Sequence, residues 1–505
     1  VRELAVSDPN RVAIVFEGHM MTYAQLDRRS NAVANGLIAA RIPAQSRIAL
    51  LDFNDLSYAE ILLGAQKTGH ALCPINARLA APEILWILND SQAPILFVGR
   101  DHYALIEGIE SKLQFSPLIV AIHGGHPRWI SLDAWRDANS TVDPKWPISH
   151  DDDLIQLYTS GTTGNPKGVR HTHRTWHAAA AALSLTNPTA FASDGVTLIC
   201  LPLFHVAGFN PLCFVLAGGG KAVLMRRPDP SEIVTQLERQ SVTNVILVPA
   251  LILAILNSTA RPTRLASMRS LSYGASPIAQ DVLQRAREMF ACPFEHLYGM
   301  TENLGVVTAL PPAMHDGALG KLKSCGKPYV NCEVKVIDSK GCELPTGQVG
   351  EIIMRSPWIM RGYWNQPEAT TATIRDGWLW TGDAGYFDAD GFLYIHDRVK
   401  DMIKTGGENV FPAEVENAIF GHPDIADVAV IGVPDERWDE AIKAVVVLKP
   451  GAKLDVTGID TYLRARIGGF KIPKSYEVAT SLPRNASGKI LRRQLRDQYR
   501  GAPKS

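Results

Sequence analysis

Short apolar runs alternate with amphipathic stretches along the chain before Ser324. The runs at residues 12–16 and 48–51 are continuously apolar, as expected for strands that are buried on both faces. The stretch after the first run places Val33 and Leu37 on one face of a helix. This alternation predicts an α/β fold of mainly parallel sheets that helices cover on both faces.

Capping boxes mark the starts of two expected helices. In a capping box, a hydroxyl residue precedes a Glu or Gln by three positions. Thr22 with Gln25 marks one helix start, and Ser57 with Glu60 marks the next. Both boxes support helices after the first predicted strands.

The same alternation continues through the middle of the chain. Further apolar runs predict strands at residues 196–201, 222–225, 245–248 and 271–273. Ligands of open α/β sheets bind at the carboxyl ends of the strands. We therefore expect His205, Gly274 and Tyr298, which follow such runs, to face one crevice.

The pattern changes at Ser324 to Val- and Ile-rich strands with Gly and Asp turns, for example at residues 334–338 and 350–354. This change predicts a β-rich subdomain at about residues 324–396, followed by a short charged hinge and a unit large enough to fold independently. The expected division is a large N-terminal domain at residues 1–396, a hinge at 397–400 and a small mobile α+β C-terminal domain at 401–505.

Composition excludes several classes of function. The 505 residues include 51 Lys and Arg and 51 Asp and Glu, so the formal net charge is zero and no basic field favours nucleic acid. Residues 195–220 lack charged side chains, but Pro202, His205 and three glycines interrupt them, which argues against a membrane span. Peripheral membrane contact stays compatible with the sequence. Seven scattered cysteines without a C-x-x-C pair indicate reduced, buried thiols and a cytoplasmic protein.

A polar run at residues 158–169 directly follows a strand-like apolar stretch. Glycines let backbone N–H groups approach an anion, hydroxyls add donors and a lysine adds positive charge, so the expected ligand is a polyphosphate. The spacing excludes a Walker loop, because Pro166 and Gly168 occupy the positions of its second glycine and its magnesium-binding hydroxyl. The expected phosphate contacts are Thr159, Ser160, Gly161, Thr162, Thr163, Gly164 and Lys167.

This run resembles the signature loop of the superfamily of AMP-forming acyl-CoA synthetases, adenylation domains and luciferases. Five further stretches match motifs of this superfamily in the same order, and together the six cover essentially the whole chain. Six spaced motifs in order are far more specific than any one of them. The five stretches are Leu-Phe-His-Val-Ala-Gly at 203–208, Tyr-Gly-Met-Thr-Glu at 298–302, Trp-Thr-Gly-Asp at 380–383, Asp-Arg-Val-Lys-Asp at 397–401 with Gly-Gly-Glu-Asn at 406–409, and Pro-Arg-Asn-Ala-Ser-Gly-Lys at 483–489.

The resemblance implies roles in binding ATP and Mg²⁺. Glu302 would hold Mg²⁺, Tyr298 would stack on adenine, and Asp383 would accept the ribose hydroxyls. Arg398 would contact the nucleotide, and Lys489 would bridge the substrate carboxylate and the α-phosphate. The other implied nucleotide contacts are Gly274, Ala275, Ser276, Gly299, Met300 and Thr301. The implied catalytic residues are Lys489, His205, Thr301 and Glu302.

The resemblance also implies a tunnel for coenzyme A and a pocket for the acyl group. Lys404, Gly406 and Gly407 would line the tunnel once the C-terminal domain has rotated about Lys400, and His205 would separate tunnel and pocket. The implied acyl pocket is His205, Val206, Phe209, Val248, Tyr273 and Gly274. These stretches are mostly apolar and contain no arginine, so the expected substrate is an apolar monocarboxylic acid.

The resemblance therefore implies an ATP-dependent acid:CoA ligase that forms an acyl-adenylate and then a thioester. The acid would be a medium- to long-chain fatty acid or an aromatic acid of the benzoate or cinnamate kind, and the chain could act as a homodimer. One alternative is an adenylating enzyme that loads a carrier protein, and another is a luciferase-like oxygenase. A catalytically silent binding protein is disfavoured, because Lys167, Glu302, Asp383, Arg398 and Lys489 are all present.

Overall fold

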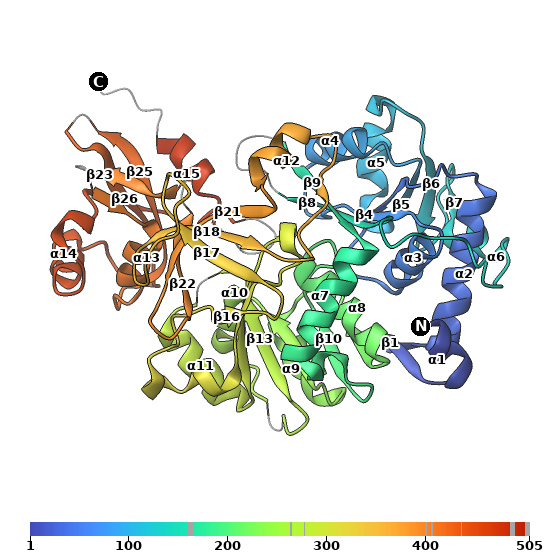
Figure 1. Ribbon diagram of the computed structural model, residues 1–505, viewed down its shortest axis with the longest axis horizontal. Helices are drawn as coiled ribbons and strands as arrows, with labels where there is room; N and C mark the ends of the chain where they lie inside the picture. The colour runs from blue at the N-terminus through green and yellow to red at the C-terminus, as the bar shows by residue number, and fades with distance from the viewer. Residues whose placement is uncertain are drawn as a thin grey trace.

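A computed structural model gives the fold of the chain (Figure 1). It describes residues 1–159, 165–262, 265–276, 278–398, 401–405, 408–435, 437–484 and 490–499, with only the backbone described at 397, 398, 408, 409 and 439. Within these residues the strands form two large sheets and two smaller ones.

The first large sheet has nine strands in the described chain, and its central pairs are parallel. Two strands from the N-terminus join one edge of a sheet that otherwise comes from the middle of the chain. The strand order is β16 (Lys327–Pro328), β15 (Thr308–Leu310), β14 (Phe294–Tyr298), β13 (Ser270–Gly274), β12 (Asn244–Leu247), β10 (Val196–Ile199), β11 (Lys221–Leu224), β1 (Val12–Phe16) and β2 (His19–Thr22).

The second large sheet has eight strands in the same described residues and is parallel except around β8 and β9. A short strand from the β-rich region, β19, forms its edge beside β9. The strand order is β19 (Gly362–Tyr363), β9 (Lys167–Thr172), β8 (Asp153–Thr159), β4 (Ala71–Pro74), β3 (Arg47–Leu51), β5 (Ile95–Gly99), β6 (Leu118–Ile122) and β7 (Ile130–Ser131).

The two smaller sheets come from the C-terminal part of the chain, which lies at the left of Figure 1. The antiparallel sheet of the β-rich region contains β17 (Glu333–Ile337), β18 (Gly350–Arg355), β20 (Ile374–Arg375), β21 (Trp378–Phe387) and β22 (Leu393–Arg398). The sheet of the last unit contains β23 (Ile403–Thr405), β24 (Glu408–Val410), β25 (Ile425–Asp435), β26 (Asp439–Leu448) and β27 (Ser475–Val478).

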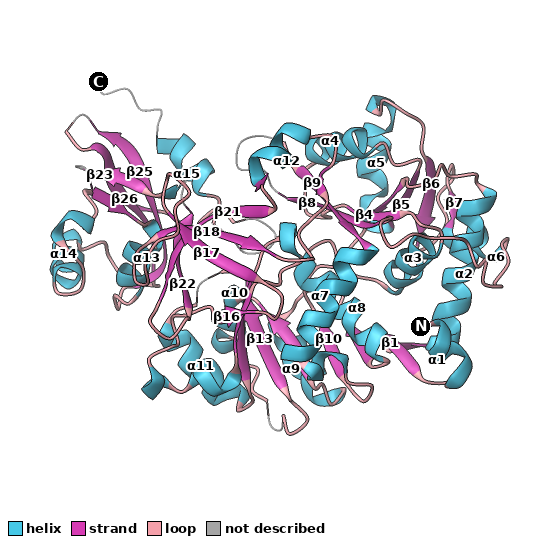
Figure 2. Cartoon of the chain, in the orientation of Figure 1, coloured by secondary structure: helices cyan, strands magenta, loops and turns pink. Residues whose placement is uncertain are grey.

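Helices cover both faces of the two large sheets (Figure 2). They are α1 (Arg2–Ser7), α2 (Tyr23–Ala39), α3 (Leu56–Lys67), α4 (Ala81–Ser91), α5 (Tyr103–Ile109), α6 (Leu132–Asp137), α7 (His173–Thr186), α8 (Val206–Gly218), α9 (Pro230–Arg239), α10 (Pro249–Asn257), α11 (Gln280–Phe290) and α12 (Pro367–Thr373). The last unit carries α13 (Pro412–Phe420), α14 (Val456–Arg464) and α15 (Arg492–Tyr499).

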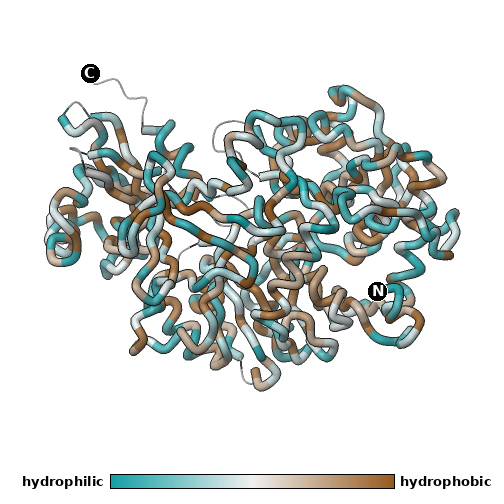
Figure 3. The backbone as a smooth tube through the Cα atoms, in the orientation of Figure 1, coloured by the Kyte–Doolittle hydropathy of each residue, from teal (hydrophilic) through white to brown (hydrophobic). Residues whose placement is uncertain are grey.

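Strand alternation assigns successive side chains to separate cores. In β3, Ile48 and Leu50 face the core shared by the two large sheets, whereas Ala49 and Leu51 face the core under α4 and α5. A third core lies between the nine-stranded sheet and helices α9, α10 and α11. Figure 3 shows hydrophobic residues along the central strands and hydrophilic ones on outer loops. The predicted α/β fold of doubly covered sheets with a smaller C-terminal domain is confirmed.

Of the two predicted capping boxes, one is confirmed and the other was wrong. Thr22 and Gln25 form the predicted capping box of α2. Ser57 does not cap α3, because the carboxylate of Asp55 accepts the Ser57 amide at 2.8 Å and begins the helix. Glu60 is buried and pairs with Arg29 and Arg136 instead of reaching back to a cap.

The region without charged side chains forms β10 and α8, not a membrane span. In the described chain, every helix is too short or too polar to cross a bilayer. All seven cysteines are free, but Cys342 is exposed, Cys213 and Cys292 are half-buried, and the expectation of burial holds only for the other four.

Candidate active site

Two of the residues expected to bind the nucleotide are joined directly. Tyr298 ends β14 and donates its hydroxyl to Oδ2 of Asp383 in β21, at 2.7 Å. Burial, reinforced by the adjacent carboxylate, raises the pKa of Tyr298 well above its usual range, so the phenol stays protonated as the donor. The backbone of Arg398 in β22 lies in register with Asp383. Three sequence motifs that are far apart therefore meet at one place.

A second group forms around Glu302, which lies in a single 3₁₀ turn, η4 (Thr301–Asn303). The Tyr363 hydroxyl donates to Oε1 of Glu302 at 2.8 Å. Lys167 places its Nζ 4.8 Å from the centre of the Tyr363 ring, within the range of a cation–π contact. The expected magnesium ligand and the expected phosphate lysine thus share one neighbour.

Tyr363 was not predicted from the sequence. It belongs to β19, whose backbone pairs with Val169 in β9 immediately after the phosphate loop. The long separation along the chain leaves no local pattern that indicates this pairing. In the sequence, only its place beside Trp364 distinguishes it from the other tyrosines.

The turn that carries Glu302 is fixed by its backbone. His171 Nε2 donates to the Thr301 carbonyl at 2.8 Å, and burial lowers the pKa of His171 to about 4, so the ring is a neutral donor. A Cβ on Gly299 would lie 2.1 Å from the carbonyl carbon of Gly305, so only glycine allows this close approach. The Met300 amide donates to Asn303 across the turn at 2.9 Å.

The remaining predicted nucleotide residues lie at strand ends. Thr159 ends β8, and its hydroxyl lies 3.4 Å from the Lys167 carbonyl on the neighbouring strand. Gly274 ends β13, and Ala275 follows it with a positive φ of 68° and an exposed side chain. Ser276 is half-buried beside them.

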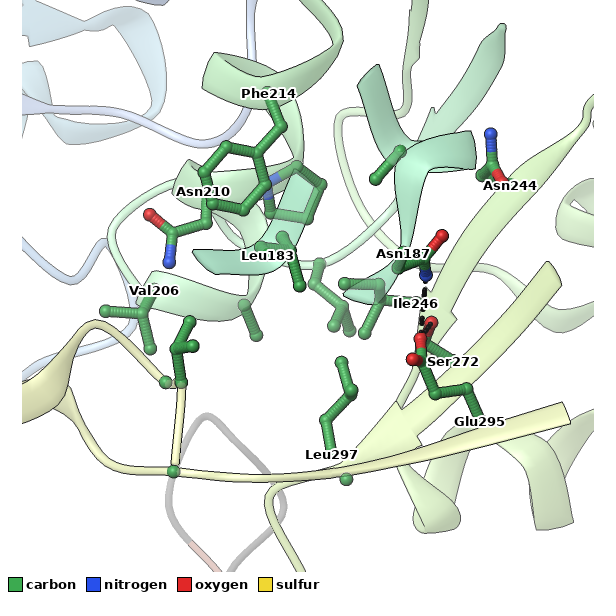
Figure 4. A pocket seen from close by; sticks show the side chains of 18 of the residues that line it. Leu183, Asn187, Val206, Asn210, Phe214, Asn244, Ile246, Ser272, Glu295 and Leu297 are labelled. Atoms are coloured by element: carbon green, nitrogen blue, oxygen red, sulfur yellow. Dashed lines mark hydrogen bonds between the residues drawn. The ribbon is translucent and has the colours of Figure 1, made fainter. Parts of the chain in front are cut away.

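A cavity of about 140 Å³ opens between β13, β14 and α8 (Figure 4). Gly274, Ala275 and Gly299 line it where the strands end, so the cavity adjoins the expected nucleotide residues. Its wall also includes Val206, Ala207, Asn210, Pro211, Phe214, Ile246, Leu247, Val248, Leu297, Leu304, Gly305 and Val306.

Three of the six residues expected for an acyl pocket line this cavity, namely Val206, Val248 and Gly274. Tyr273 does not, because alternation along β13 turns it to the opposite face, where its ring stacks on His296 at 4.7 Å. Phe209 is fully buried in the core between the two large sheets. His205 lies just before α8 and packs edge-on against Phe204.

His205 is a neutral side chain in this structure. Burial lowers the pKa of its imidazole to about 4, and nearby Arg78 adds to the shift. Its Nε2 has no hydrogen-bond partner in the described chain. The expected role as a gate between pocket and tunnel stays a prediction.

The inner end of the cavity is more polar than the sequence suggested. Side chains from four neighbouring strands and from the residue after α7 meet there. They are Asn187, Thr197, Asn244, Ser270, Ser272 and Glu295. The alternation Ser270, Ser272, Gly274 along β13 is the sequence pattern that could have indicated this polar strip, which was not predicted from the sequence.

Several predicted residues lie outside the described part of the chain. They are Ser160, Gly161, Thr162, Thr163, Gly164, Lys400, Gly406, Gly407 and Lys489, and Arg398 is described by its backbone alone. Lys404 is exposed on β23, and its amide donates to Oε2 of Glu440 at 2.9 Å. The predicted tunnel, hinge and catalytic lysine therefore stay predictions.

The family model of the AMP-binding enzyme matches residues 1–364, and that of the AMP-binding enzyme C-terminal domain matches residues 414–489. The chain belongs to this family. The resemblance inferred from the six motifs is thereby confirmed.

Curated relatives and a solved structure agree with this assignment. The fatty acid–[acyl-carrier-protein] ligase ScoC of Streptomyces coeruleorubidus is 38% identical over 98% of this chain and 95% of its own. A feruloyl-CoA synthase of an Amycolatopsis species is 37% identical over 97% of this chain and 96% of its own. The crystal structure of an anthranilate CoA ligase in complex with anthranoyl-AMP superposes with a TM-score of 0.89 at 28% identity, covering 97% of this chain and 94% of that one.

Proposed function

We propose that this AMP-binding enzyme is an AMP-forming acid:CoA ligase. The observation that carries the proposal is the placement of the acid-sized cavity beside the nucleotide group. Gly274, the last residue of β13, and Leu297, the residue before the last of β14, both line the cavity. Ala275 follows β13, while Tyr298 ends β14 and Thr301 and Glu302 follow it. A carboxylic acid held in the cavity would present its carboxylate to a nucleotide bound at these strand ends.

In the proposed first step, the carboxylate of the acid attacks the α-phosphate of ATP, an acyl-adenylate forms and pyrophosphate leaves. Asp383 accepts the ribose hydroxyls while Tyr298 holds its orientation. Lys167 supplies positive charge to the departing phosphates, and Lys489 supplies it at the reacting oxygens. No covalent enzyme intermediate is required, because the residues act by positioning and by stabilising charge.

Glu302 fits a role as the ligand of Mg²⁺. Its Oε1 accepts from Tyr363, and in the described chain no hydrogen bond reaches Oε2. The described residues contain no cluster of three or more His, Cys, Asp or Glu side chains that could hold a metal ion alone. Mg²⁺ usually binds one or two carboxylates plus phosphate oxygens. When bound with ATP, it would neutralise charge on the leaving pyrophosphate.

The size of the cavity supports a small acyl group. Its volume of about 140 Å³ is close to the roughly 150 Å³ that holds one benzene molecule in an engineered protein cavity. A one-ring aromatic acid or a fatty acid of modest length fits this space better than a long acyl chain. Val206, Leu297 and Val306 supply apolar contacts along its walls.

In the proposed second step, a thiol displaces AMP and forms the thioester. Lys404, Gly406 and Gly407 line the thiol tunnel after the C-terminal domain has rotated about Lys400. Coenzyme A is the proposed acceptor, as in the feruloyl-CoA synthase relative, whereas ScoC is named for an acyl-carrier protein. The seven free cysteines favour a reducing compartment such as the cytoplasm.

The test is product analysis after incubating the enzyme with Mg²⁺, ATP, CoA and single acids. The panel contains hexanoate, palmitate, benzoate, 4-hydroxybenzoate and ferulate. AMP together with one acyl-CoA is the expected result. AMP without acyl-CoA would indicate a carrier protein or another acceptor, oxygen consumption would indicate an oxygenase, and ADP would contradict the proposal.

A further inference from the structure

Glu295 is a buried carboxyl group at the inner end of the cavity, with only 3% of its surface exposed. Its Oε2 accepts from Asn187 at 2.7 Å and from Ser272 at 3.1 Å, and Figure 4 shows these bonds at one side of the cavity. Among the described residues no hydrogen bond reaches Oε1 and no cation pairs with the group. Burial raises the pKa of Glu295, and the two hydrogen bonds offset only part of that rise.

Two further polar atoms at this end have no partner in the described chain. They are Oδ1 of Asn244 and Oγ of Ser270, which face each other in register on β12 and β13. The amide group of Asn244 is oriented by its Nδ2, which donates to the Thr189 carbonyl and to the Thr243 hydroxyl. Both atoms have almost no accessible surface, so they lie behind the cavity wall and a ligand in the cavity does not reach them.

The three polar groups share one face of the sheet with the end of the cavity near the nucleotide. Ser272 lies two residues before Gly274, and Glu295 lies two residues before Leu297 on the adjacent strand. Two residues of parallel strand span roughly 7 Å. An acid whose carboxylate lies near Gly274 therefore points its far end towards Glu295, past the apolar side chains of Ile246 and Leu297 (Figure 4).

We infer that Glu295 selects acids that carry a hydrogen-bond donor at the end opposite the carboxylate. This inference rests on the proposed function, and it names the substrate class as ring-hydroxylated or ring-aminated aromatic monocarboxylic acids. The inner end offers Oε1 of Glu295, which can accept a hydrogen bond and receives none in the described chain. A hydroxyl or amino group matches this acceptor. A second carboxylate would place two carboxyl groups in one buried site, which is unfavourable, and an unsubstituted ring leaves Oε1 unpaired.

A purely structural role for Glu295 would require only an acceptor for Asn187 and Ser272, which tie the residue after α7 to β13. Glutamine would serve that role equally well and would avoid burying a carboxyl group without a cation. The substitution Glu295→Gln therefore separates the two explanations. It keeps the size of the side chain and one oxygen for both hydrogen bonds, but it turns a donor towards the cavity.

The experiment compares benzoate, 4-hydroxybenzoate, 4-aminobenzoate and terephthalate, together with cinnamate and 4-hydroxycinnamate. kcat/KM for pyrophosphate release is measured for the wild-type enzyme, Glu295→Gln and a control, Glu288→Gln. Glu288 is an exposed residue of α11 on the outer side of the same sheet. Binding of each acid to the same three proteins is measured by calorimetry without ATP.

We expect the wild-type enzyme to prefer the hydroxylated or aminated acid over its unsubstituted partner by about 10- to 100-fold, as for a buried polar atom that otherwise stays without a hydrogen bond. In Glu295→Gln this ratio should fall to within about threefold of unity, whereas Glu288→Gln should keep it. Terephthalate should be the poorest substrate of the wild-type enzyme and should gain most from Glu295→Gln.

Equal use of the paired acids by the wild-type enzyme, or an unchanged ratio in Glu295→Gln, would overturn the inference. Absence of both binding and turnover for every donor-bearing acid would overturn it too. If no acid yields AMP but calorimetry shows the donor preference, the proposed function fails and the assignment of the cavity stands. If Glu295→Gln does not fold, the wild-type ratios alone decide.

Discussion

Asp383 is oriented by a neighbouring side chain. The Tyr298 hydroxyl donates to its Oδ2, and a carboxylate offers about four sites for hydrogen bonds. Asp383 is buried, and hydrogen bonds to its carboxylate are stronger there than in water. A ribose would therefore meet a carboxylate that is already oriented.

Asp383→Asn tests this assignment. The substitution removes the charge and replaces one acceptor oxygen by a donor, so kcat/KM for ATP should fall by about 10- to 100-fold. The KM for the acid should change little. ATP–pyrophosphate exchange measures both constants.

Asp376→Asn is the matched control for Asp383→Asn. Asp376 is exposed and has a φ of 50°, which asparagine also adopts, so activity should be unchanged. A loss that falls equally on the acid and on ATP would contradict the ribose assignment.

Some residues of the site could be predicted from the sequence and others could not. Asp383 and Glu302 were predicted because their motifs are local, and Tyr298 meets Asp383 as expected of one site. Tyr363 and Glu295 were not predicted, because each acts through a partner that lies in another segment or strand. Short polar residues such as Ser270 and Ser272 are common in strands, and the sequence does not show that this face of the strand lines a cavity.

At the scale of elements, the junction of β6 with α3 joins charges from several segments. His123 follows β6, and its Nε2 lies 2.9 Å from Asp55, the residue that caps α3. The hydrogen bond to Asp55 raises the pKa of His123. Burial tends to raise the pKa of Asp55, but the bonds from His123 and Ser57 outweigh it and lower that pKa. Asp52 and Arg226 are the other charged groups that act on His123.

The signs of these shifts predict a pH window for stability. The contribution of Asp55 is lost as the pH falls below its usual pKa of about 4, and that of His123 is lost as the pH rises above about 6.5. His123→Asn keeps the positive φ of 62° but removes the charge. The apparent melting temperature of the wild-type protein should exceed that of the variant by up to about 2 °C near pH 5–6. The difference should vanish by about pH 9.

Thermal unfolding followed by calorimetry from pH 4 to pH 9 measures this difference. The predicted magnitude is small because the His123 side chain is 39% exposed and solvent screens the pair. A difference that grows from pH 6 to pH 9 would show that the pair does not act as described.

Element boundaries were more predictable than the partners of the elements. Continuous apolar runs correctly predicted β1 and β3, and the capping box of α2 was confirmed. The prediction for the start of α3 failed because Asp55, two residues before Ser57, is an equally good N-cap, and its carboxylate accepts the Ser57 amide. Such competition between neighbouring caps is decided by backbone geometry, which the sequence does not display.

The whole molecule joins segments that are distant in the sequence. β1 and β2 complete the nine-stranded sheet from the N-terminus, and β19 completes the eight-stranded sheet from the β-rich region. A local pattern predicts that a segment is a strand but does not name its neighbour. The same holds for the site, because β9 and β19 bring Lys167 and Tyr363 together although 196 positions separate them in the sequence.

The proposed division of labour between the large and small domains yields the last prediction. Lys489, in the final motif of the small domain, is assigned to the adenylation step alone. Lys489→Ala should lower ATP–pyrophosphate exchange by at least about 100-fold, because the charge that bridges carboxylate and α-phosphate is lost. The same variant should convert preformed acyl-adenylate and CoA to acyl-CoA at close to the wild-type rate.

Gly407→Trp is the complementary variant, since it places a bulky side chain in the proposed thiol tunnel. It should leave ATP–pyrophosphate exchange nearly intact while slowing thioester formation from the preformed adenylate. Opposite defects in the two variants would mean that the small domain uses one surface for adenylation and another for thioester formation. Only a rotation of the domain lets both surfaces reach the same site. Equal loss of both half-reactions in Lys489→Ala would instead mean that the residue supports the fold or a shared step, and the alternating use of the domain would have to be abandoned.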